Sequence, residues 1–235
     1  MHILQAFQDA ILLLLSGDET LWQIIWISLK TTVLALLLAA PLAVFAGYCL
    51  ASYRFPLRRA LIGISQVSLS VPTVVIGLVL YLSLSRQGPA GDLRWLFTQT
   101  GIVAGQVFIA LPVLVAFTLT AVSATDKRVA ETAVTLGASR WRLMWTVLFE
   151  ARFGVMAAVM TGFGRVISEV GCAMMVGGNI AGETRTITTA IALETSKGEF
   201  AQGMALGLVL VLLALLINAG LMLVQGDAQA SGSAQ

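Results

Sequence analysis

Apolar runs of membrane-spanning length recur along this chain, and short polar loops separate them. Hydrophobic residues make up 58% of the sequence and charged residues only 11%, a balance that no water-soluble domain of this size needs. A bilayer core offers backbone groups no hydrogen-bonding partner, so such runs predict transmembrane helices. We expect an all-α, polytopic membrane protein with five transmembrane helices, at about residues 21–50, 60–84, 101–123, from the end of a basic segment (125–154) to 176, and 201–224.

These spans are expected to form one transmembrane domain, residues 1–225, followed by a polar, disordered C-terminal tail, residues 226–235. Ahead of the first span, an apolar stripe at helical spacing predicts an amphipathic helix lying on the membrane surface. The stripe consists of Ile3, Leu4, Phe7, Ile11 and Leu14. No basic region precedes it and no small-residue cleavage site follows, so it is not a signal peptide.

Two prolines, Pro72 and Pro112, are expected to interrupt the second and third spans. The segment 177–200 carries five charged side chains and is not expected to cross the membrane, although residues 187–193 are apolar enough for a short helix dipping into it. No histidine and cysteine cluster has metal-ligand spacing, and no phosphate-binding loop is present. We therefore expect no metal site, no catalytic residue and no ATPase activity in this chain.

The distribution of positive charge predicts the orientation, because cytoplasmic loops are richer in lysine and arginine. Five basic residues lie on the side expected to be outside: Lys30, Arg86, Arg94, Arg185 and Lys197. Eight lie on the other side: Arg54, Arg58, Arg59, Lys127, Arg128, Arg140, Arg142 and Arg152. The prediction is a multi-pass protein of the cell inner membrane with its N-terminus outside and its C-terminus in the cytoplasm.

The basic segment 125–154 is predicted to form two short helices around a glycine. Asp126 can cap the first helix, from Lys127 to about Leu136, and Ser139 can cap the second. Gly137 suits the left-handed position that follows a helix end. A basic helix–glycine–helix segment between two spans is typical of a docking surface for another protein.

Glu131-Thr132-Ala133, three residues and then Gly137 resemble the E-A-A-x-x-x-G loop of ATP-binding-cassette (ABC) importer permeases, which forms a coupling helix seated on the ATPase subunit. The family pattern continues to I-x-L-P, and this chain has Glu150 in place of the proline. The alternative is that the short motif occurs by chance in a helix. The resemblance implies a coupling role for six residues: Glu131, Thr132, Ala133, Gly137, Ala138 and Ser139.

The same resemblance implies the five-helix core of a type I importer permease. It implies a homodimer of this chain, two ABC ATPase subunits, an extracytoplasmic oxyanion-binding protein and no nucleic acid. This chain would hold no cofactor, since ATP and Mg²⁺ would be bound by the ATPase subunits.

Charged and donor-rich residues near the fourth span are candidates for the translocation pathway. Arg165 and Glu169 are spaced i, i+4 at membrane depth, where they either neutralise each other or line the pathway. Glycine N–H groups and threonine hydroxyls farther on could face an anion or could only shape a loop. These candidates are Gly178, Asn179, Thr184, Thr186 and Thr188.

The runs at 71–78, 168–171, 174–180 and 188–195 resemble the membrane subunits of molybdate and tungstate importers, and most of all the tungstate branch. The resemblance implies transport of tungstate into the cytoplasm by alternating access. A molybdate or sulfate importer is the alternative within the class. A self-contained secondary carrier is the alternative from another class, although no inverted internal repeat is visible.

Overall fold

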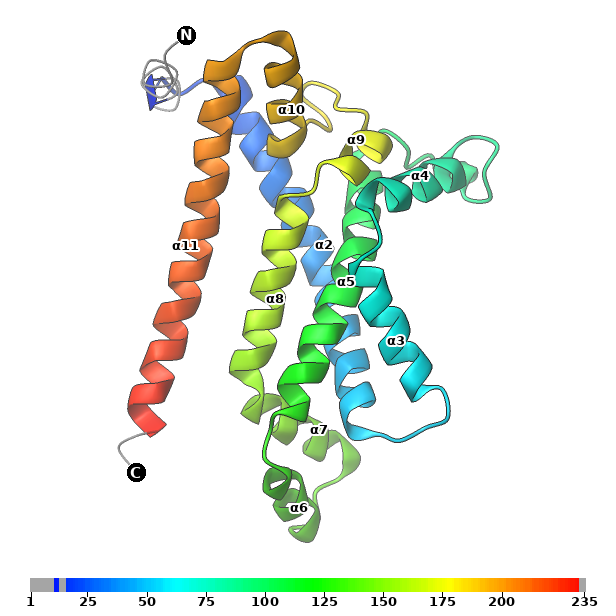
Figure 1. Ribbon diagram of the computed structural model, residues 1–235, viewed down its shortest axis with the longest axis vertical. Helices are drawn as coiled ribbons and strands as arrows, with labels where there is room; N and C mark the ends of the chain where they lie inside the picture. The colour runs from blue at the N-terminus through cyan, green and yellow to red at the C-terminus, as the bar shows by residue number, and fades with distance from the viewer. Residues whose placement is uncertain (1–10, 13–15, 233–235) are drawn as a thin grey trace. The chain divides into compact units, whose positions relative to one another are not determined.

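The computed structural model describes residues 11–12 and 16–232, and in these residues it contains helices and no β-strand (Figure 1). The amphipathic helix predicted near the N-terminus falls mostly outside the described residues. The elements are α2 (Glu19–Ser52), α3 (Arg58–Leu69), α4 (Thr73–Leu84), a 3-10 turn η1 (Gly91–Leu93), α5 (Gln99–Ser123), α6 (Lys127–Thr135), α7 (Arg140–Glu150), α8 (Arg152–Ile167), α9 (Gly171–Gly177), α10 (Ile187–Lys197) and α11 (Phe200–Gly232).

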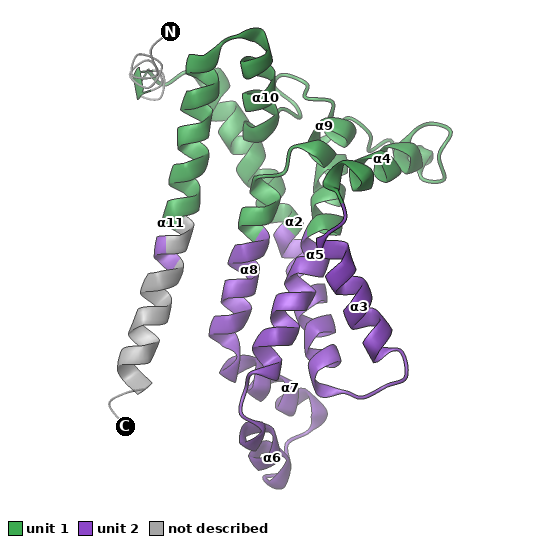
Figure 2. Cartoon of the chain, viewed as in Figure 1, with its two compact units in different colours: residues 1–35, 72–109, 163–217 green, residues 36–71, 110–162, 218–235 purple. Residues whose placement is uncertain are grey.

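The helices form two compact units that are interleaved along the sequence (Figure 2). Unit 1 contains residues 1–35, 72–109 and 163–217, and unit 2 contains residues 36–71, 110–162 and 218–235. Four long helices, α2, α5, α8 and α11, contribute residues to both units. The expectation of a single domain over residues 1–225 stays a prediction.

Two helices, α2 and α5, are each long and apolar enough to cross a membrane unbroken. Asp18 precedes α2 and accepts hydrogen bonds from the hydroxyl and backbone N–H of Thr20, which lower the pKa of the Asp18 carboxyl. Pro112 lies inside α5 without ending it, contrary to the expected interruption, and Pro41 lies inside α2. Transmembrane helices tolerate proline where neighbouring groups satisfy the freed carbonyl.

The second predicted span is broken rather than merely kinked. Between α3 and α4 the helix axis turns by 102°, and Pro72 stands at the N-cap of α4 in an extended conformation. A proline has no N–H to donate and disfavours helical backbone in the residue before it, so the chain leaves the helix here. If each bent pair is counted as one span, the described residues contain up to four candidate spans. The apolar helix Phe200–Leu216 is shorter than these spans. The number of five spans therefore stays a prediction.

The fourth predicted span differs most from the structure, because it does not continue to Val176. It begins with a 72° bend between α7 and α8, and α8 ends at Ile167. Glu169 lies in the non-helical break, and α9 starts afresh at Gly171. The break is stable because polar groups around Glu169 satisfy the backbone there, as described below.

The last two helices pack together in unit 1. Buried residues of α2, α10 and α11 form one apolar cluster that includes Leu21, Ile187 and Leu206. The segment expected to hold a short helix is α10, and Thr186 and Thr189 close a reciprocal capping box at its start. The helix α11 runs on to Gly232, so helical backbone covers most of the tail that we expected to be disordered from residue 226.

Candidate functional site

The segment α6–Gly137–α7 has the local structure that its sequence predicts. Asp126 accepts a hydrogen bond from the Arg128 N–H at 2.9 Å, and Ser139 accepts one from the Arg142 N–H at 3.4 Å. Gly137 has φ +78°, in the left-handed region, and the Ala138 N–H donates to the Ala133 carbonyl at 3.0 Å. Both caps and the glycine turn of this segment are confirmed, while its contact with an ATPase stays a prediction.

The outer surface of α6 is open. Glu131 and Thr132 are exposed, Leu136 is 82% exposed, and Ala133 is the one residue of α6 that is buried. Leu136 therefore does not share a packed face with Ala133, although helical spacing places the two on one side. The reason is that α6 ends at Thr135, so Leu136 is the cap residue beyond the helix and lies past the packed positions Ala130 and Ala133.

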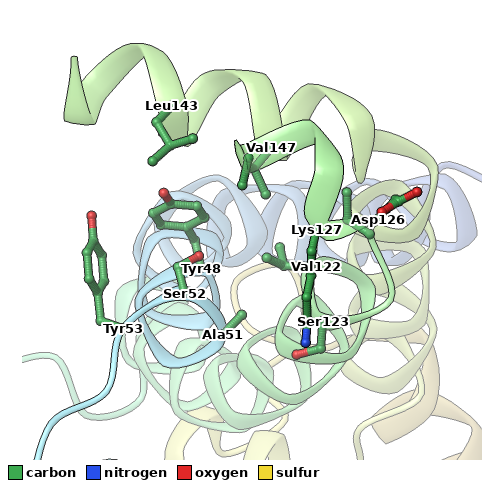
Figure 3. Close-up of a pocket in the computed structure, with 12 residues that line it drawn as sticks. Tyr48, Ala51, Ser52, Tyr53, Val122, Ser123, Asp126, Lys127, Leu143 and Val147 are labelled. Atoms are coloured by element: carbon green, nitrogen blue, oxygen red, sulfur yellow. The ribbon is translucent and has the colours of Figure 1, made fainter. Parts of the chain in front are cut away.

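Beneath this segment lies a cavity of about 300 Å³ within unit 2. Figure 3 shows Lys127 extending toward Ser123 along the cavity wall, while the Asp126 carboxylate points away. Tyr48 of α2 and Val147 of α7 close the other side, and both belong to the apolar core that anchors α7. The cavity places the start of α6 beside the ends of two apolar helices, α2 and α5.

The second candidate site is the Arg165–Glu169 pair in unit 1. The Arg165 Nη1 lies 3.5 Å from Glu169 Oε2, and the two side chains are 41% and 2% exposed, respectively. The other carboxylate oxygen of Glu169 accepts the Cys172 N–H at 3.0 Å, and the Glu169 carbonyl accepts the Thr188 hydroxyl at 2.7 Å. Glu169 is thus a buried structural centre, whereas Arg165 presents its charge at the surface of the chain.

The three predicted pathway threonines are buried, and each hydroxyl has partners within the chain. Thr184 donates to the Gly177 carbonyl at 2.6 Å and accepts the Ile180 N–H at 2.9 Å. Thr186 caps α10, and Thr188 bonds Glu169. These bonds shape the loop between α9 and α10, which is the alternative role considered from the sequence. A direct role for the three hydroxyls in the pathway stays a prediction.

The same loop carries two donor-rich positions nearer the surface. Gly178 and Asn179 are consecutive left-handed residues, with φ +70° and +52°, and Gly178 is exposed. Arg185 donates from Nη2 to the Asn179 carbonyl at 3.5 Å. The Arg185 Nε and the Asn179 Oδ1 are both buried without a hydrogen-bonding partner. A guanidinium with an unused donor is the feature of this loop best suited to an anion.

Sequence reasoning missed the polar residues that hold this loop in place. Gln23 donates to the Gly182 carbonyl at 3.3 Å, and Gln99 donates to the Glu183 carbonyl at 2.8 Å. Lys30 donates to the Gln99 side-chain oxygen at 2.9 Å. Ser28 accepts the Ile187 N–H at 2.7 Å. The sequence did contain a signal for these contacts, because the residues that make them are polar side chains near the ends of apolar runs.

A polar recess in unit 2 was also missed. It measures about 380 Å³ and lies between α3 and α5. Its hydrophilic groups come from Ser65, Gln66 and Ser70 on one side and Thr120 on the other, and the rest of its lining is apolar. Amide and hydroxyl groups inside predicted spans are unusual, and their signal in the sequence was the pair Ser65-Gln66 inside an apolar run.

Comparison with known proteins identifies the family. Residues 39–226 match the family described as the binding-protein-dependent transport system inner membrane component. The chain belongs to this family of permeases. Among solved structures, a bacterial alginate ABC transporter in complex with a periplasmic protein matches with a TM-score of 0.73 and 18% identity, covering 89% of this chain and 80% of the other. At that identity the likeness establishes the importer-permease fold alone.

Curated relatives of this permease cover nearly its whole length. The tungstate uptake system permease protein TupB of Campylobacter jejuni is 39% identical over 217 residues, 92% of this chain and 91% of the relative. TupB of Peptoclostridium acidaminophilum is 35% identical and covers 93% of this chain and 96% of the relative. The molybdenum transport system permease protein ModB of Escherichia coli is 30% identical and covers 76% and 82%, respectively.

Proposed function

We propose that this permease moves tungstate into the cytoplasm as the membrane subunit of an ATP-driven ABC importer. The observation that carries the proposal is the 39% identity with a tungstate permease along almost the entire length of both chains. A molybdate permease is matched at 30% identity over a smaller share of the chain, which makes molybdate the second candidate. Two copies of the chain, two ATPase subunits and an extracytoplasmic binding protein would form the complex.

Coupling would occur at α6. The exposed Glu131 and Thr132, with the open end at Leu136, form a small knob that an ATPase cleft could hold. Closure of the ATPase pair on ATP would move this knob, and the capped junction through Gly137 and Ser139 would pass the displacement to α7. The excess of positive charge around α6 supports a cytoplasmic position, with the N-terminus of the chain outside.

The anion would enter beside the loop at Asn179 and Arg185 and pass the exposed charge of Arg165. Tungstate is a tetrahedral dianion whose four oxygens accept hydrogen bonds and donate none. A pathway for tungstate therefore needs cations and hydrogen-bond donors. Its binding sites should be weak, because a tight binding site would trap the ion. The Gln66 amide and the hydroxyls of Ser65 and Ser70 supply further donors of this kind in the recess between α3 and α5.

The test is uptake into proteoliposomes that contain the permease, its ATPase and its binding protein, with ATP inside the compartment that faces α6. Labelled tungstate should accumulate only with hydrolysable ATP, and unlabelled tungstate should compete at lower concentration than molybdate. Sulfate should compete poorly. Preferred competition by molybdate would move the substrate to the second candidate, and uptake by the permease alone would favour a self-contained carrier.

A pair of variants tests the pathway within this assay. Arg165→Gln should reduce uptake at saturating ATP while leaving the ATPase bound, because it removes a 41% exposed cation and leaves the hydrogen bond between the Cys172 N–H and Glu169 in place. Arg86→Gln, in the exposed loop after α4, is the matched control and should transport normally. Equal activity of both variants would remove Arg165 from the pathway.

A further inference from the structure

The helix α7 has two apolar faces, and the fold uses only one of them. Met144 and Val147 point into the core of unit 2 and are buried. On the other side, Trp141, Trp145 and Phe149 recur every four residues and are 66%, 64% and 67% exposed. A helix in water would carry polar residues on the exposed face, so this stripe of three large aromatic side chains needs another environment.

The direction of α7 matches the surface of a membrane. Its axis turns by 72° into α8, the apolar helix that continues the chain toward the membrane interior. When α8 crosses the bilayer, α7 therefore lies closer to the membrane plane than to its normal. Tryptophan is enriched at this depth, because its ring is apolar and its indole N–H prefers the wet headgroup layer.

The exposed stripe joins the apolar surface of a membrane-spanning helix. Trp141 lines a recess of about 200 Å³ with Phe45, Tyr53 and Arg140, all in unit 2. Phe45 continues an exposed apolar row on α2 that includes Leu38 and Leu42. Because the apolar surface continues from a spanning helix onto α7, we expect lipid to cover both. The recess offers room for part of an acyl chain.

Three arginines lie around the stripe. Arg140 and Arg142 flank Trp141, and the Arg152 guanidinium lies 4.4 Å from the centroid of the Phe149 ring. Within the described part of the chain, no carboxylate forms an ion pair with any of these three arginines. Arginines beside interfacial aromatic residues fit the phosphates of anionic lipids, which attract basic segments at the cytoplasmic leaflet.

We propose that the outward face of α7 binds anionic phospholipid of the cytoplasmic leaflet, with Trp141, Trp145 and Phe149 in the interface and Arg140 and Arg142 on lipid phosphates. The choice of the cytoplasmic leaflet rests on the proposed function. The face lies on α7 and is separate from the coupling knob on α6, which is formed by Glu131, Thr132 and Leu136. Lipid bound on α7 would hold the α7–α8 bend while α6 moves.

The experiment uses the assembled transporter in nanodiscs and brominated lipids, which quench tryptophan fluorescence on contact. Each variant retains one of the five tryptophans, with the others changed to phenylalanine. Trp145 should be quenched by brominated phosphatidylglycerol at a lower mole fraction than by brominated phosphatidylcholine. Trp22 is the control, because it is 55% exposed on α2 with the acidic Glu19 and no cation within four residues, and it should be quenched equally by both lipids.

The headgroup preference at Trp145 should depend on the two arginines. Changing both Arg140 and Arg142 to glutamine should weaken it by about fivefold per arginine. The double change Arg86→Gln and Arg94→Gln, in an exposed loop outside α7, removes the same charge and should leave the preference intact. Circular dichroism and ATPase co-purification check that each variant is folded and assembled.

Three results would overturn the proposal. These are no lipid quenching at Trp145, equal quenching by both lipids, and quenching that disappears when the ATPase binds, which would mean that the ATPase covers the stripe. Tungstate uptake is measured in parallel with the same preparations. Lipid quenching without tungstate uptake would reject the proposed function and keep the lipid site. Uptake without quenching would reject the lipid site and keep the proposed function.

Discussion

The carboxylate of Glu169 lies 3.5 Å from the Arg165 guanidinium although α8, the helix that carries Arg165, ends at Ile167. The pair therefore joins the end of one helix to the break that follows it, and the second carboxylate oxygen reaches forward to the first turn of α9. One buried side chain thus connects both sides of the interruption.

Replacing Glu169 should destabilise the protein more than replacing Arg165. Glu169→Ala removes the acceptor of the buried Cys172 N–H, and leaving such a group unpaired costs about 1–3 kcal/mol. Arg165→Ala removes the cation that lies 3.5 Å from the buried Glu169 carboxylate, but it leaves the Cys172 N–H bonded to that carboxylate. Thermal unfolding of the detergent-solubilised permease compares the two, and a larger loss for Arg165→Ala would contradict the arrangement.

The turn at Gly137 should tolerate asparagine and reject valine. Its φ of +78° is left-handed, but nothing lies within 4 Å of the position that a Cβ would occupy. The cost of a substitution is therefore backbone strain alone, about 1–2 kcal/mol for an ordinary residue and less for asparagine. ATP-driven uptake and ATPase co-purification should fall with Gly137→Val and be largely retained with Gly137→Asn. Equal behaviour of the two variants would show that the turn plays no part in coupling.

Gly77→Ala should disrupt the packing of α4 on α9. A Cβ at Gly77 would lie 2.8 Å from the Cys172 Cα, a backbone atom that cannot step aside. Overpacking of this kind costs about 1–3 kcal/mol. The matched control is Gly63→Ala in α3, where a Cβ meets nothing within 4 Å and the change should be neutral or slightly stabilising. Yield and melting temperature distinguish the two variants, and an unchanged Gly77→Ala protein would contradict the close approach.

The orientation can be tested with single cysteines in a background that lacks Cys49 and Cys172. A cysteine at Ser85 or Lys197 should react with an impermeant thiol reagent added to intact cells. A cysteine at Ser139 should react only after the membrane is opened, because α6 and α7 face the cytoplasm in the proposed function. Ser139 and Lys197 are exposed in the chain and Ser85 is half-buried, so a lack of labelling at Ser139 in intact cells reports on the side of the membrane. Labelling at Ser139 in intact cells would reverse the orientation.

Local signals in the sequence determined much of this protein. Asp126 and Ser139 begin α6 and α7, Gly137 separates them, and Pro72 divides the second span. Each of these effects depends on a residue's own backbone preference or on a hydrogen bond to a residue two or three positions away. The apolar runs likewise fixed the helical class, because a bilayer leaves few alternatives to a helix.

Only the tertiary structure decided how the candidate pathway residues are used. The break after Ile167 is satisfied by Thr188, which lies 19 residues from its partner Glu169, and the loop at Gly182 is held by Gln23, 159 residues away. The sequence also did not reveal the exposed stripe on α7, because an apolar residue at position 145 can face either the core or a lipid. Helical period places a residue on a face, but the contacts of that face depend on segments far away in the sequence.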